Sequence, residues 1–344
     1  MLEKIKDIWK KYFMLSCFMC ILTMLTLFLL VKFDDLVLGL VVMAILLLIL
    51  NILFCKLLNR FVKSKRIKTC FLTVLILINI IVSASTTISL LSDQMFFYPN
   101  QDKEAYNKNL KNENYEEIKI TKDDDILNGW LLKNIEGKAP LIIYFGGNGE
   151  CSARRFDNNF VSKKWGYFEE YNFMMVDYPG YGNTSGTPSD KTMFENALKT
   201  YDYAVSREDV DQKNIVIMGY SIGTGVATYL ASQRDIKSLI LLAPYDEGIT
   251  LYNSQVNIFY GPLKYLVKYK FESIEYAKSV KVKPLILASK DDELIPYSSS
   301  FKLSNQFPCG SNLITYEGFK HNDFWGQIEV LEKVEEHLQE VKDE

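Results

Sequence analysis

The sequence Gly-Tyr-Ser-Ile-Gly at residues 219–223 constrains the fold of this chain more than any other stretch. An apolar run typical of a buried strand, Ile215–Met218, precedes it, and a run of small residues typical of a helix, Gly223–Ala231, follows it. A sharp strand-to-helix turn requires small residues two positions before and after the serine, and glycine meets this requirement because it has no side chain. The pattern predicts a nucleophile elbow that presents the hydroxyl of Ser221 at the end of a strand. The alternative is a glycine-rich turn whose serine has no role.

The C-terminal part of the chain alternates between strand and helix patterns. Eight short runs have the apolar or alternating character of strands: Tyr115–Thr121, Leu127–Leu132, Pro140–Phe145, Phe173–Val176, Ile215–Met218, Leu239–Ala243, Leu285–Ala288 and Leu313–Tyr316. Helical patterns occur at Arg154–Phe168, Ser189–Ser206, Gly223–Gln233, Ser298–Gln306 and Asp323–Val341. The first two strands are predicted to form a hairpin. Because helices separate most of the later strands, we expect an α/β fold with a mostly parallel sheet and helices on both faces.

A serine becomes a nucleophile only when a base takes its proton and a carboxylate orients that base. The chain has two histidines. His337 lies within the last predicted helix beside two glutamates, where we expect a solvated face. His321 follows the last predicted strand, and sheets of this kind place their chemistry at the carboxyl ends of strands. His321 is therefore the predicted base.

The predicted acid is Asp292, which follows the strand at Leu285–Ala288, with the adjacent Asp291 as its competitor. The resulting order of serine, acid and histidine along the chain is the order expected for a nucleophile elbow on an α/β sheet. No step of this chemistry requires a metal or an organic cofactor.

An oxyanion hole requires two backbone N–H groups directed at the charge that develops on the substrate oxygen. Ile222 follows the nucleophile and is the first predicted donor. The second is expected from the glycine-rich residues 146–149, with Asn148 preferred and Gly147 or Gly149 as alternatives. A glycine-rich loop also suggests phosphate binding, but no Lys-Ser/Thr pair follows and neither nucleotide fingerprint is matched.

Three apolar runs, Phe13–Val31, Leu36–Phe54 and Phe71–Leu91, dominate the N-terminal third. Each has about the twenty residues that a helix needs to cross a hydrocarbon core of ~30 Å. They predict three transmembrane helices, whose polar residues suit helix packing better than a transport path. We therefore expect a membrane anchor at 1–92, a linker at 93–114 and a catalytic domain at 115–344, with a short lid at about 245–271.

Basic residues set the expected orientation. Lysines and arginines are concentrated before the first run and between the second and third, whereas the link at 32–35 carries one lysine and two aspartates. Because loops rich in lysine and arginine stay on the cytoplasmic side, we expect a multi-pass cell-membrane protein with a cytoplasmic N-terminus and an extracytoplasmic catalytic domain.

Overall charge and cysteine content exclude other classes of protein. The net charge of −3 does not suggest a nucleic-acid partner. Four of the six cysteines lie in the N-terminal third, and the remaining two, Cys151 and Cys309, are far apart in the sequence. This spacing matches neither a disulfide framework nor a metal site, and it predicts isolated, buried thiols, with a single bridge as the alternative. The sequence does not specify an oligomeric state.

From about Met95 onward the chain resembles the α/β-hydrolases, most closely the membrane-anchored serine hydrolases related to protein depalmitoylases and to serine-aminopeptidase-type hydrolases. The matching motifs are Thr121–Trp130, Phe145–Gly149, Asp177–Gly186, Gly219–Gly223, Ala243–Asp246, Asp292–Pro296 and Gly318–Asp323. The resemblance implies a Ser221–Asp292–His321 triad. One departure stands out, because Gly146 replaces the histidine of the family's usual His-Gly-Asn.

These observations predict a membrane-anchored serine hydrolase that cleaves carboxylic esters or thioesters, with lipids or acylated molecules as its substrates. The aromatic lid suits either an acyl-binding wall or ordinary packing. One rival is a serine aminopeptidase or amidase, which needs an acidic pocket for a substrate amine, and Asp246, Glu247 or Glu150 are its candidates. The other is a catalytically silent membrane receptor or scaffold on the same fold.

Overall fold

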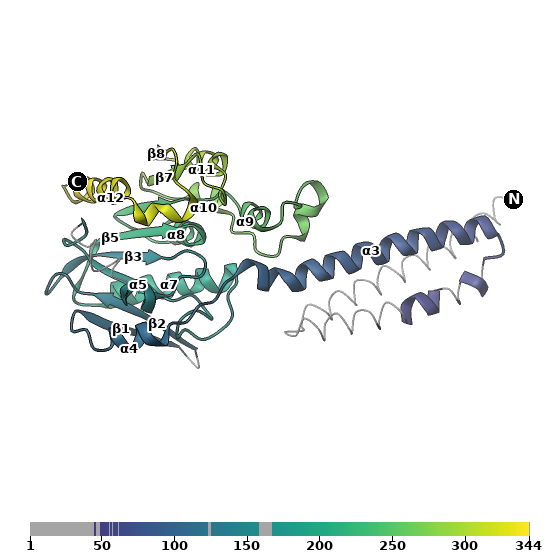
Figure 1. Ribbon diagram of the computed structural model, residues 1–344, viewed down its shortest axis with the longest axis horizontal. Helices are drawn as coiled ribbons and strands as arrows, with labels where there is room; N and C mark the ends of the chain where they lie inside the picture. The colour runs from purple at the N-terminus through teal and green to yellow at the C-terminus, as the bar shows by residue number, and fades with distance from the viewer. Residues whose placement is uncertain are drawn as a thin grey trace. The chain divides into compact units, whose positions relative to one another are not determined.

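The computed structural model describes residues 62–122, 125–157 and 167–343, together with residues 45, 49–54, 56 and 58–60. The chain divides into two compact units, Met1–Met95 and Phe96–Glu344. The first unit contains most of the long helix α3, Lys65–Phe96, and the second contains the sheet (Figure 1). The two units are described separately below.

The N-terminal unit does not support the expectation of three transmembrane helices. The predicted span at 13–31 and most of the span at 36–54 lie outside the described residues, whereas the third span falls within α3. Among the residues that the structure describes, no helix has both the length and the apolar character that a membrane crossing needs. The side-chain amides of Asn51 and Asn79 exchange two hydrogen bonds of 3.0 Å.

The C-terminal unit is built on one eight-stranded sheet with the order β1-β2-β4-β3-β5-β6-β7-β8 (Figure 1). Its strands are β1 Tyr115–Lys122, β2 Asp125–Leu132, β3 Ala139–Phe145, β4 Asn172–Val176, β5 Val210–Tyr220, β6 Ser238–Leu242, β7 Leu285–Ser289 and β8 Asn312–Tyr316. β1 and β2 form an antiparallel hairpin, β2 pairs antiparallel with β4, and every other pairing is parallel. All eight predicted strands and the mostly parallel sheet are confirmed.

Five of the helices that the structure describes in this unit follow the predictions, with differences at their ends: α5 Ser152–Asp157, α7 Asp190–Ser206, α8 Ile222–Gln233, α11 Tyr297–Ser304 and α12 Ile328–Asp343. The structure also has α4 Lys103–Asn109, α9 Gly248–Gln255 and α10 Ser273–Ala277, which were not predicted as helices, and the 3₁₀ helices η2 at Gly261–Leu266 and η3 at His321–Gly326. The helix predicted at 323–341 begins late, because residues 321–326 form the tighter turn of η3. The helix predicted at 154–168 is described only as far as Asp157, since 158–166 lie outside the described residues.

The two faces of the sheet carry different helices. Alternate strand residues such as Ile142, Val216 and Leu287 are fully buried in a cluster shared with α5 and α12. The intervening residues face the other side, where α8 packs on β3, β5 and β6 and α7 packs on α8. The carboxyl ends of the parallel strands therefore emerge between two helical layers.

His337 is buried rather than solvated, so the expectation for this residue is wrong. It lies three residues after Val334 and four before Val341, on the stripe of α12 that faces the sheet. Its Nε2 lies 2.7 Å from the Oγ of Ser238 at the start of β6. The ring is thus a core histidine beside the start of β6, whereas the predicted site lies at the carboxyl ends of the strands.

The segment expected to be a linker contains a packed helix. α4 begins after Asp102, whose carboxylate accepts a hydrogen bond of 3.0 Å from the N–H of Ala105. At its other end the buried Asn109 donates to the carbonyl of Ala153 on α5 over 2.9 Å. A polar composition is compatible with both a surface helix and a free linker, so composition alone did not reveal α4.

Candidate active site

Ser221 occupies the turn between β5 and α8 in a backbone conformation that few residues other than glycine adopt, with φ 52° and ψ −123°. A Cβ at Gly219 would lie 2.6 Å from the carbonyl oxygen of Gly223. A Cβ at Gly223 would lie 2.1 Å from the carbonyl oxygen of Phe145. Both glycines are therefore required by close backbone approach, as the sequence pattern predicts.

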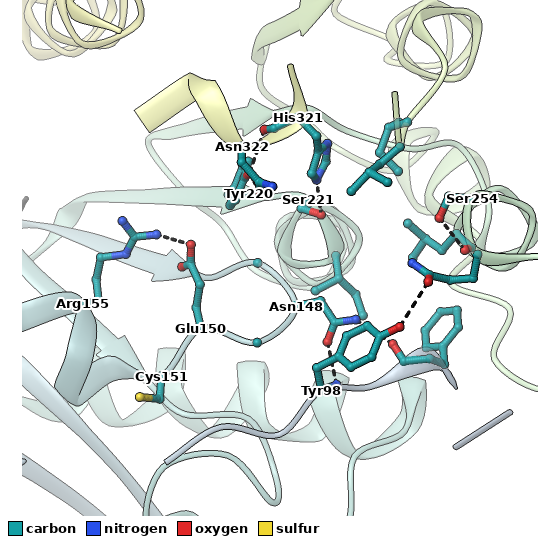
Figure 2. A pocket seen from close by; sticks show the side chains of 18 of the residues that line it. Tyr98, Asn148, Glu150, Cys151, Arg155, Tyr220, Ser221, Ser254, His321 and Asn322 are labelled. Carbon is teal, nitrogen blue, oxygen red and sulfur yellow. Dashed lines mark hydrogen bonds and ion pairs between the residues drawn. The ribbon is translucent and has the colours of Figure 1, made fainter. Parts of the chain in front are cut away.

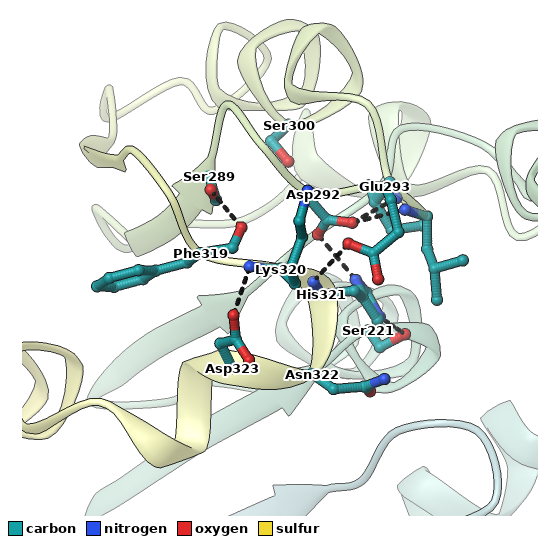
Figure 3. Close-up of polar contacts among 12 residues, drawn as sticks. Ser221, Ser289, Asp292, Glu293, Ser300, Phe319, Lys320, His321, Asn322 and Asp323 are labelled. Carbon is teal, nitrogen blue, oxygen red and sulfur yellow. Dashed lines mark hydrogen bonds and ion pairs between the residues drawn. The ribbon is translucent and has the colours of Figure 1, made fainter.

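The three residues of the predicted triad lie in one hydrogen-bonded line (Figure 3). The Nε2 of His321 is 2.8 Å from the Oγ of Ser221, and its Nδ1 is 2.8 Å from Oδ2 of Asp292. They come from three loops that follow β5, β7 and β8, and all three side chains are buried. The line has the geometry that proton transfer from serine to imidazole needs.

Asp292 is held in place by its own loop. Its second carboxylate oxygen accepts hydrogen bonds from the backbone N–H groups of Leu294 and Ile295, over 2.9 and 2.8 Å. The competitor Asp291 instead accepts from the N–H of Gly318, over 2.6 Å. Neighbouring side chains thus serve different purposes, and only Asp292 reaches the histidine.

Two residues that the sequence analysis missed fix the histidine loop. Glu293 accepts a hydrogen bond of 3.1 Å from the backbone N–H of His321. The hydroxyl of Tyr220 donates to the carbonyl of His321 over 2.8 Å, and the two rings stack with centroids 5.5 Å apart. The only signal for them in the sequence is that Glu293 adjoins Asp292 and Tyr220 adjoins Ser221. Neither residue has a catalytic role of its own in these motifs.

Residues 146–149 are called the glycine loop below, and three of them, Gly147, Asn148 and Gly149, line a cavity together with Ser221 and Ile222. Figure 2 shows Asn148 and Ser221 in this cavity. The hydroxyl of Tyr178 donates to the carbonyl of Gly146 and that of Tyr181 donates to Oδ1 of Asn148, both over 2.8 Å. These contacts give a physical reason for the Asp177–Gly186 motif, because its tyrosines brace the loop.

The side chain of Asn148 is turned away from any substrate. Its Oδ1 accepts hydrogen bonds from the hydroxyl of Tyr181 and the N–H of Tyr98, and its Nδ2 donates to the carbonyl of Phe96 over 2.7 Å. Both ends of the amide are occupied, which leaves the backbone N–H of Asn148 as its group for an oxyanion. The N–H of Ile222, in the first turn of α8, is the other predicted donor.

The position of the family's usual histidine is filled by another side chain. A Cβ at Gly146 would lie 2.7 Å from Oε2 of Glu150. This carboxylate accepts a hydrogen bond of 3.0 Å from the hydroxyl of Tyr144 and pairs with the guanidinium of Arg155. Arg155 in turn lies over the rings of Tyr144 and Trp325, 5.4 and 5.3 Å from their centroids. The position of the Glu150 carboxylate therefore depends on the absence of a side chain at residue 146.

Two of the three acidic residues considered as anchors for a substrate amine, Asp246 and Glu150, already pair with basic side chains. Burial raises the pKa of Asp246, but hydrogen bonds from Ser299, Thr250 and Lys302 outweigh it and hold the pKa below its ordinary value. Glu150 pairs with Arg155, and Glu247 lines a separate hollow beside η2.

The cavity beside Ser221 has a volume of about 450 Å³ and two kinds of wall. Part of its lining is apolar and comes from Phe96, Tyr98, Ile222, Leu251, Leu294 and Ile295. The lining also includes polar groups, among them the paired Glu150 and Arg155 (Figure 2). This lining suits a substrate that has an apolar part and a polar part.

The aromatic residues of the predicted lid pack or face solvent and do not form the wall of this cavity. Tyr252, Phe259 and Tyr269 are buried, whereas Tyr260 and Tyr265 are 60% and 80% exposed. The lid reaches the cavity through Leu251, Ser254 and Gln255 of α9 instead. Ordinary packing is thus the better account of the lid rings.

The two cysteines of this unit are both free. Cys151 is buried, and burial raises the pKa of its thiol. Cys309 is exposed, against expectation, and donates to the carbonyl of Lys281 over 3.2 Å. A bridge between them is not formed.

Comparisons with known proteins agree with this architecture. Residues 140–279 match the family described as alpha/beta hydrolase fold. An uncharacterized protein of Mycobacterium tuberculosis is 27% identical over 204 residues, which cover 59% of this chain and 70% of the relative. The human alpha/beta hydrolase domain-containing protein 17C is 28% identical over 167 residues, which cover 48% of this chain and 49% of the relative. The chain thus spans about half the length of this human relative.

Solved structures share the fold at low identity. The esterase Pf2001 of Pyrococcus furiosus superposes with a TM-score of 0.56 at 18% identity, covering 72% of this chain and 98% of the esterase. Est1E from Butyrivibrio proteoclasticus superposes with a TM-score of 0.53 at 21% identity, covering 66% and 99%. The C-terminal unit therefore has the alpha/beta hydrolase fold.

Proposed function

We propose that this protein, whose C-terminal unit has the alpha/beta hydrolase fold, is a serine hydrolase that cleaves carboxylic esters or thioesters through an acyl-enzyme. The observation that carries the proposal is the line of hydrogen bonds from Ser221 through His321 to Asp292, with 2.8 Å at each step. The glycine loop beside it supplies a place for the oxyanion. The esterases among the solved neighbours support the same class of reaction by analogy of fold.

The mechanism follows from these positions. The Oγ of Ser221 attacks the substrate carbonyl while its proton passes to Nε2 of His321, and Asp292 stabilises the imidazolium through Nδ1. The N–H groups of Ile222 and Asn148 stabilise the oxyanion of the tetrahedral intermediate. As the intermediate collapses, the leaving alcohol or thiol takes the proton from Nε2 and the acyl group stays on Ser221. A water molecule activated by His321 then releases the acid and restores the serine.

The walls of the cavity favour an acyl substrate. Apolar side chains such as Leu251 and Ile295 suit an aliphatic or aromatic acyl group, since each buried methylene contributes about 0.8 kcal/mol. The aminopeptidase alternative is weakened because Asp246 and Glu150 already pair with Lys302 and Arg155. The silent scaffold is weakened because it has no need of aligned hydrogen bonds or of a strained serine.

We also propose that the N-terminal apolar runs tether the hydrolase to a membrane, with the N-terminus in the cytoplasm and the catalytic unit outside. The support is the length of the runs and the distribution of lysine and arginine around them. Retention of the protein in the pellet after alkaline carbonate extraction tests the tether. A reporter that works only in the cytoplasm, fused after the C-terminus, tests the orientation, and activity of that reporter contradicts it.

A fluorophosphonate probe tests the catalytic proposal directly, because it labels only an activated serine. Full-length wild type is compared with Ser221→Ala and His321→Ala in detergent, alongside hydrolysis of p-nitrophenyl and thioester substrates of increasing chain length. We expect labelling of wild type, none of Ser221→Ala, and a rate for His321→Ala lower by at least about a thousandfold. Wild type that is folded but unlabelled favours the silent scaffold, and cleavage of aminoacyl anilides in preference to esters favours the aminopeptidase.

A further inference from the structure

Residues 96–100, called the clamp segment below, run along the glycine loop and hold it at two points. The Nδ2 of Asn148 donates to the carbonyl of Phe96 over 2.7 Å, and the N–H of Tyr98 donates back to Oδ1 over 3.0 Å. Two residues further on, Nδ2 of Asn100 donates to the carbonyl of Gly149 over 3.1 Å. Figure 2 shows Asn148 directed at the backbone beside Tyr98. The loop that should hold the oxyanion is thus tied to the start of this unit.

The clamp segment is itself firmly anchored, so it can fix the loop. The rings of Phe96 and Phe97 are 4% and 3% exposed and pack among Tyr252, Tyr269 and Phe271. At the other end, the carbonyl of Asn100 accepts a hydrogen bond of 2.9 Å from the N–H of Gly182. A buried aromatic cluster and a backbone hydrogen bond therefore flank the residues that hold Asn148.

The same segment also forms a wall of the cavity. Phe96 and Tyr98 belong to its apolar lining, whereas the adjacent Phe97 does not. The hydroxyl of Tyr98 donates to Oε1 of Gln255 on α9 over 3.1 Å, which joins this wall to the lid. An acyl chain entering beside Ile222 would meet the ring of Phe96 or the Tyr98–Gln255 pair.

We propose that the clamp segment completes the active site: Phe96 limits the length of the acyl chain, and the side chain of Asn148 positions its own backbone N–H as an oxyanion donor. This inference rests on the proposed function, since it assigns roles within the same reaction. Asn148 is a positioning residue through its amide, because the amide contacts only protein groups.

Two adjacent phenylalanines provide a matched test of the wall. Phe96→Ala and Phe97→Ala remove the same ring from the same buried cluster, but only Phe96 lines the cavity. For Phe96→Ala we expect the ratio of kcat/KM for a long-chain over a short-chain ester to rise about tenfold or more, since each methylene that gains a place in a pocket is worth about 10-fold or more. For Phe97→Ala we expect a lower melting temperature and an unchanged ratio. Equal ratios in the two variants overturn the assignment.

Asn148→Ala tests the positioning role, because it removes the amide and keeps the backbone N–H. Since misplacement of a catalytic group by about 1 Å can cost about 100-fold, we expect kcat to fall roughly 10- to 100-fold with KM within about twofold of wild type. Affinity for an alkyl trifluoromethyl ketone, whose adduct with serine carries an oxyanion, should fall by a similar factor. Asn100→Ala, which loses only the contact to Gly149, should show a smaller loss.

Rates in these experiments are expressed per active site titrated with the fluorophosphonate, so that loss of folded protein does not lower them. A purely structural role for Asn148 predicts fewer titratable sites and an unchanged kcat per site, and that result overturns the positioning role. Absence of labelling in wild type contradicts the proposed function itself. Labelling with full activity in both Asn148→Ala and Phe96→Ala contradicts only the inference about the clamp segment.

Discussion

Asp177 should make this protein less stable as the pH rises from about 4 to about 7. The residue follows β4 and is 2% exposed. Burial raises the pKa of its carboxyl from the ordinary 3.8 to about 6, although hydrogen bonds from the hydroxyl and the N–H of Ser152, at 2.6 and 2.5 Å, act to lower it. At neutral pH the folded protein thus keeps a negative charge in its interior.

The sign of the effect follows from proton binding. Between about pH 4 and pH 6 the folded state holds a proton on Asp177 that the unfolded chain has released, so stability falls as the pH rises through this window. Because one pKa unit is worth about 1.4 kcal/mol, the charged carboxylate lowers the free energy of unfolding by about 3 kcal/mol at neutral pH. Most of this change lies between pH 4 and pH 7.

The substitution Asp177→Asn removes the titration and keeps the contacts. An asparagine can accept from the N–H of Ser152 through its carbonyl and donate to the hydroxyl through its amide. The free energy of unfolding of the variant, relative to that of wild type, should therefore rise by about 2–3 kcal/mol between pH 4 and pH 7.5. For a unit of this size, the melting temperature of the variant should rise relative to that of wild type by roughly 5–10 °C over the same pH range.

The assay is thermal unfolding of the full-length chain in detergent, followed by intrinsic fluorescence at pH 4, 5, 6 and 7.5. Glu136→Gln, at an exposed site, controls for loss of one negative charge. Ser152→Ala should shift the pH window upward, because it removes a hydrogen bond that lowers the pKa of Asp177. A difference in melting temperature between Asp177→Asn and wild type that stays constant across the pH range refutes the reasoning.

Three further predictions concern the loops around the serine. Gly223→Ala should abolish fluorophosphonate labelling, since its Cβ would meet backbone at 2.1 Å, whereas Gly326→Ala, whose added Cβ would meet nothing within 4 Å, should label like wild type. Tyr220→Phe keeps the ring but loses the hydrogen bond to the carbonyl of His321, the proposed base, so kcat should fall about 3- to 10-fold and stability by about 1 kcal/mol, measured by steady-state kinetics and thermal unfolding. Gly146→Ala should displace the carboxylate of Glu150 and the methyl group of Met175 and cost about 1–3 kcal/mol, and combining it with Glu150→Ala should cost less than the sum, because the two changes share the contact with Glu150. Additive costs in that double-mutant cycle contradict the contact.

The strands and the triad could be predicted because each depends on local sequence. Strands buried on both faces, such as β6 and β7, are continuous apolar runs bounded by polar residues. Parallel pairing then brings their carboxyl ends to one edge, so Ser221, Asp292 and His321 meet although up to 100 residues separate them. The topology converts three separate motifs into one site.

Contacts between distant side chains could not be predicted in this way. His337 has glutamates as neighbours in sequence, but its burial depends on the stripe of α12 that meets Ser238. Asn148 was predicted for its backbone N–H, and nothing in the sequence indicates that Phe96 and Tyr98 hold its side chain. Such partners are selected by packing, which local patterns do not encode.

The departure at Gly146 illustrates how packing can replace a missing group. Without a side chain at 146, the carboxylate of Glu150 folds back into the vacant space beside the glycine loop. A partly buried carboxylate is stabilised by pairing, and Arg155 supplies the pair while its guanidinium lies over two aromatic rings. Burial lowers the pKa of Arg155 but Glu150 raises it further, so the arginine stays charged. Because the side chains of Glu150 and Arg155 are only 21% and 13% exposed, removing either partner leaves the other charge poorly solvated. The support of the glycine loop thus depends on both residues together, whereas an imidazole would act alone.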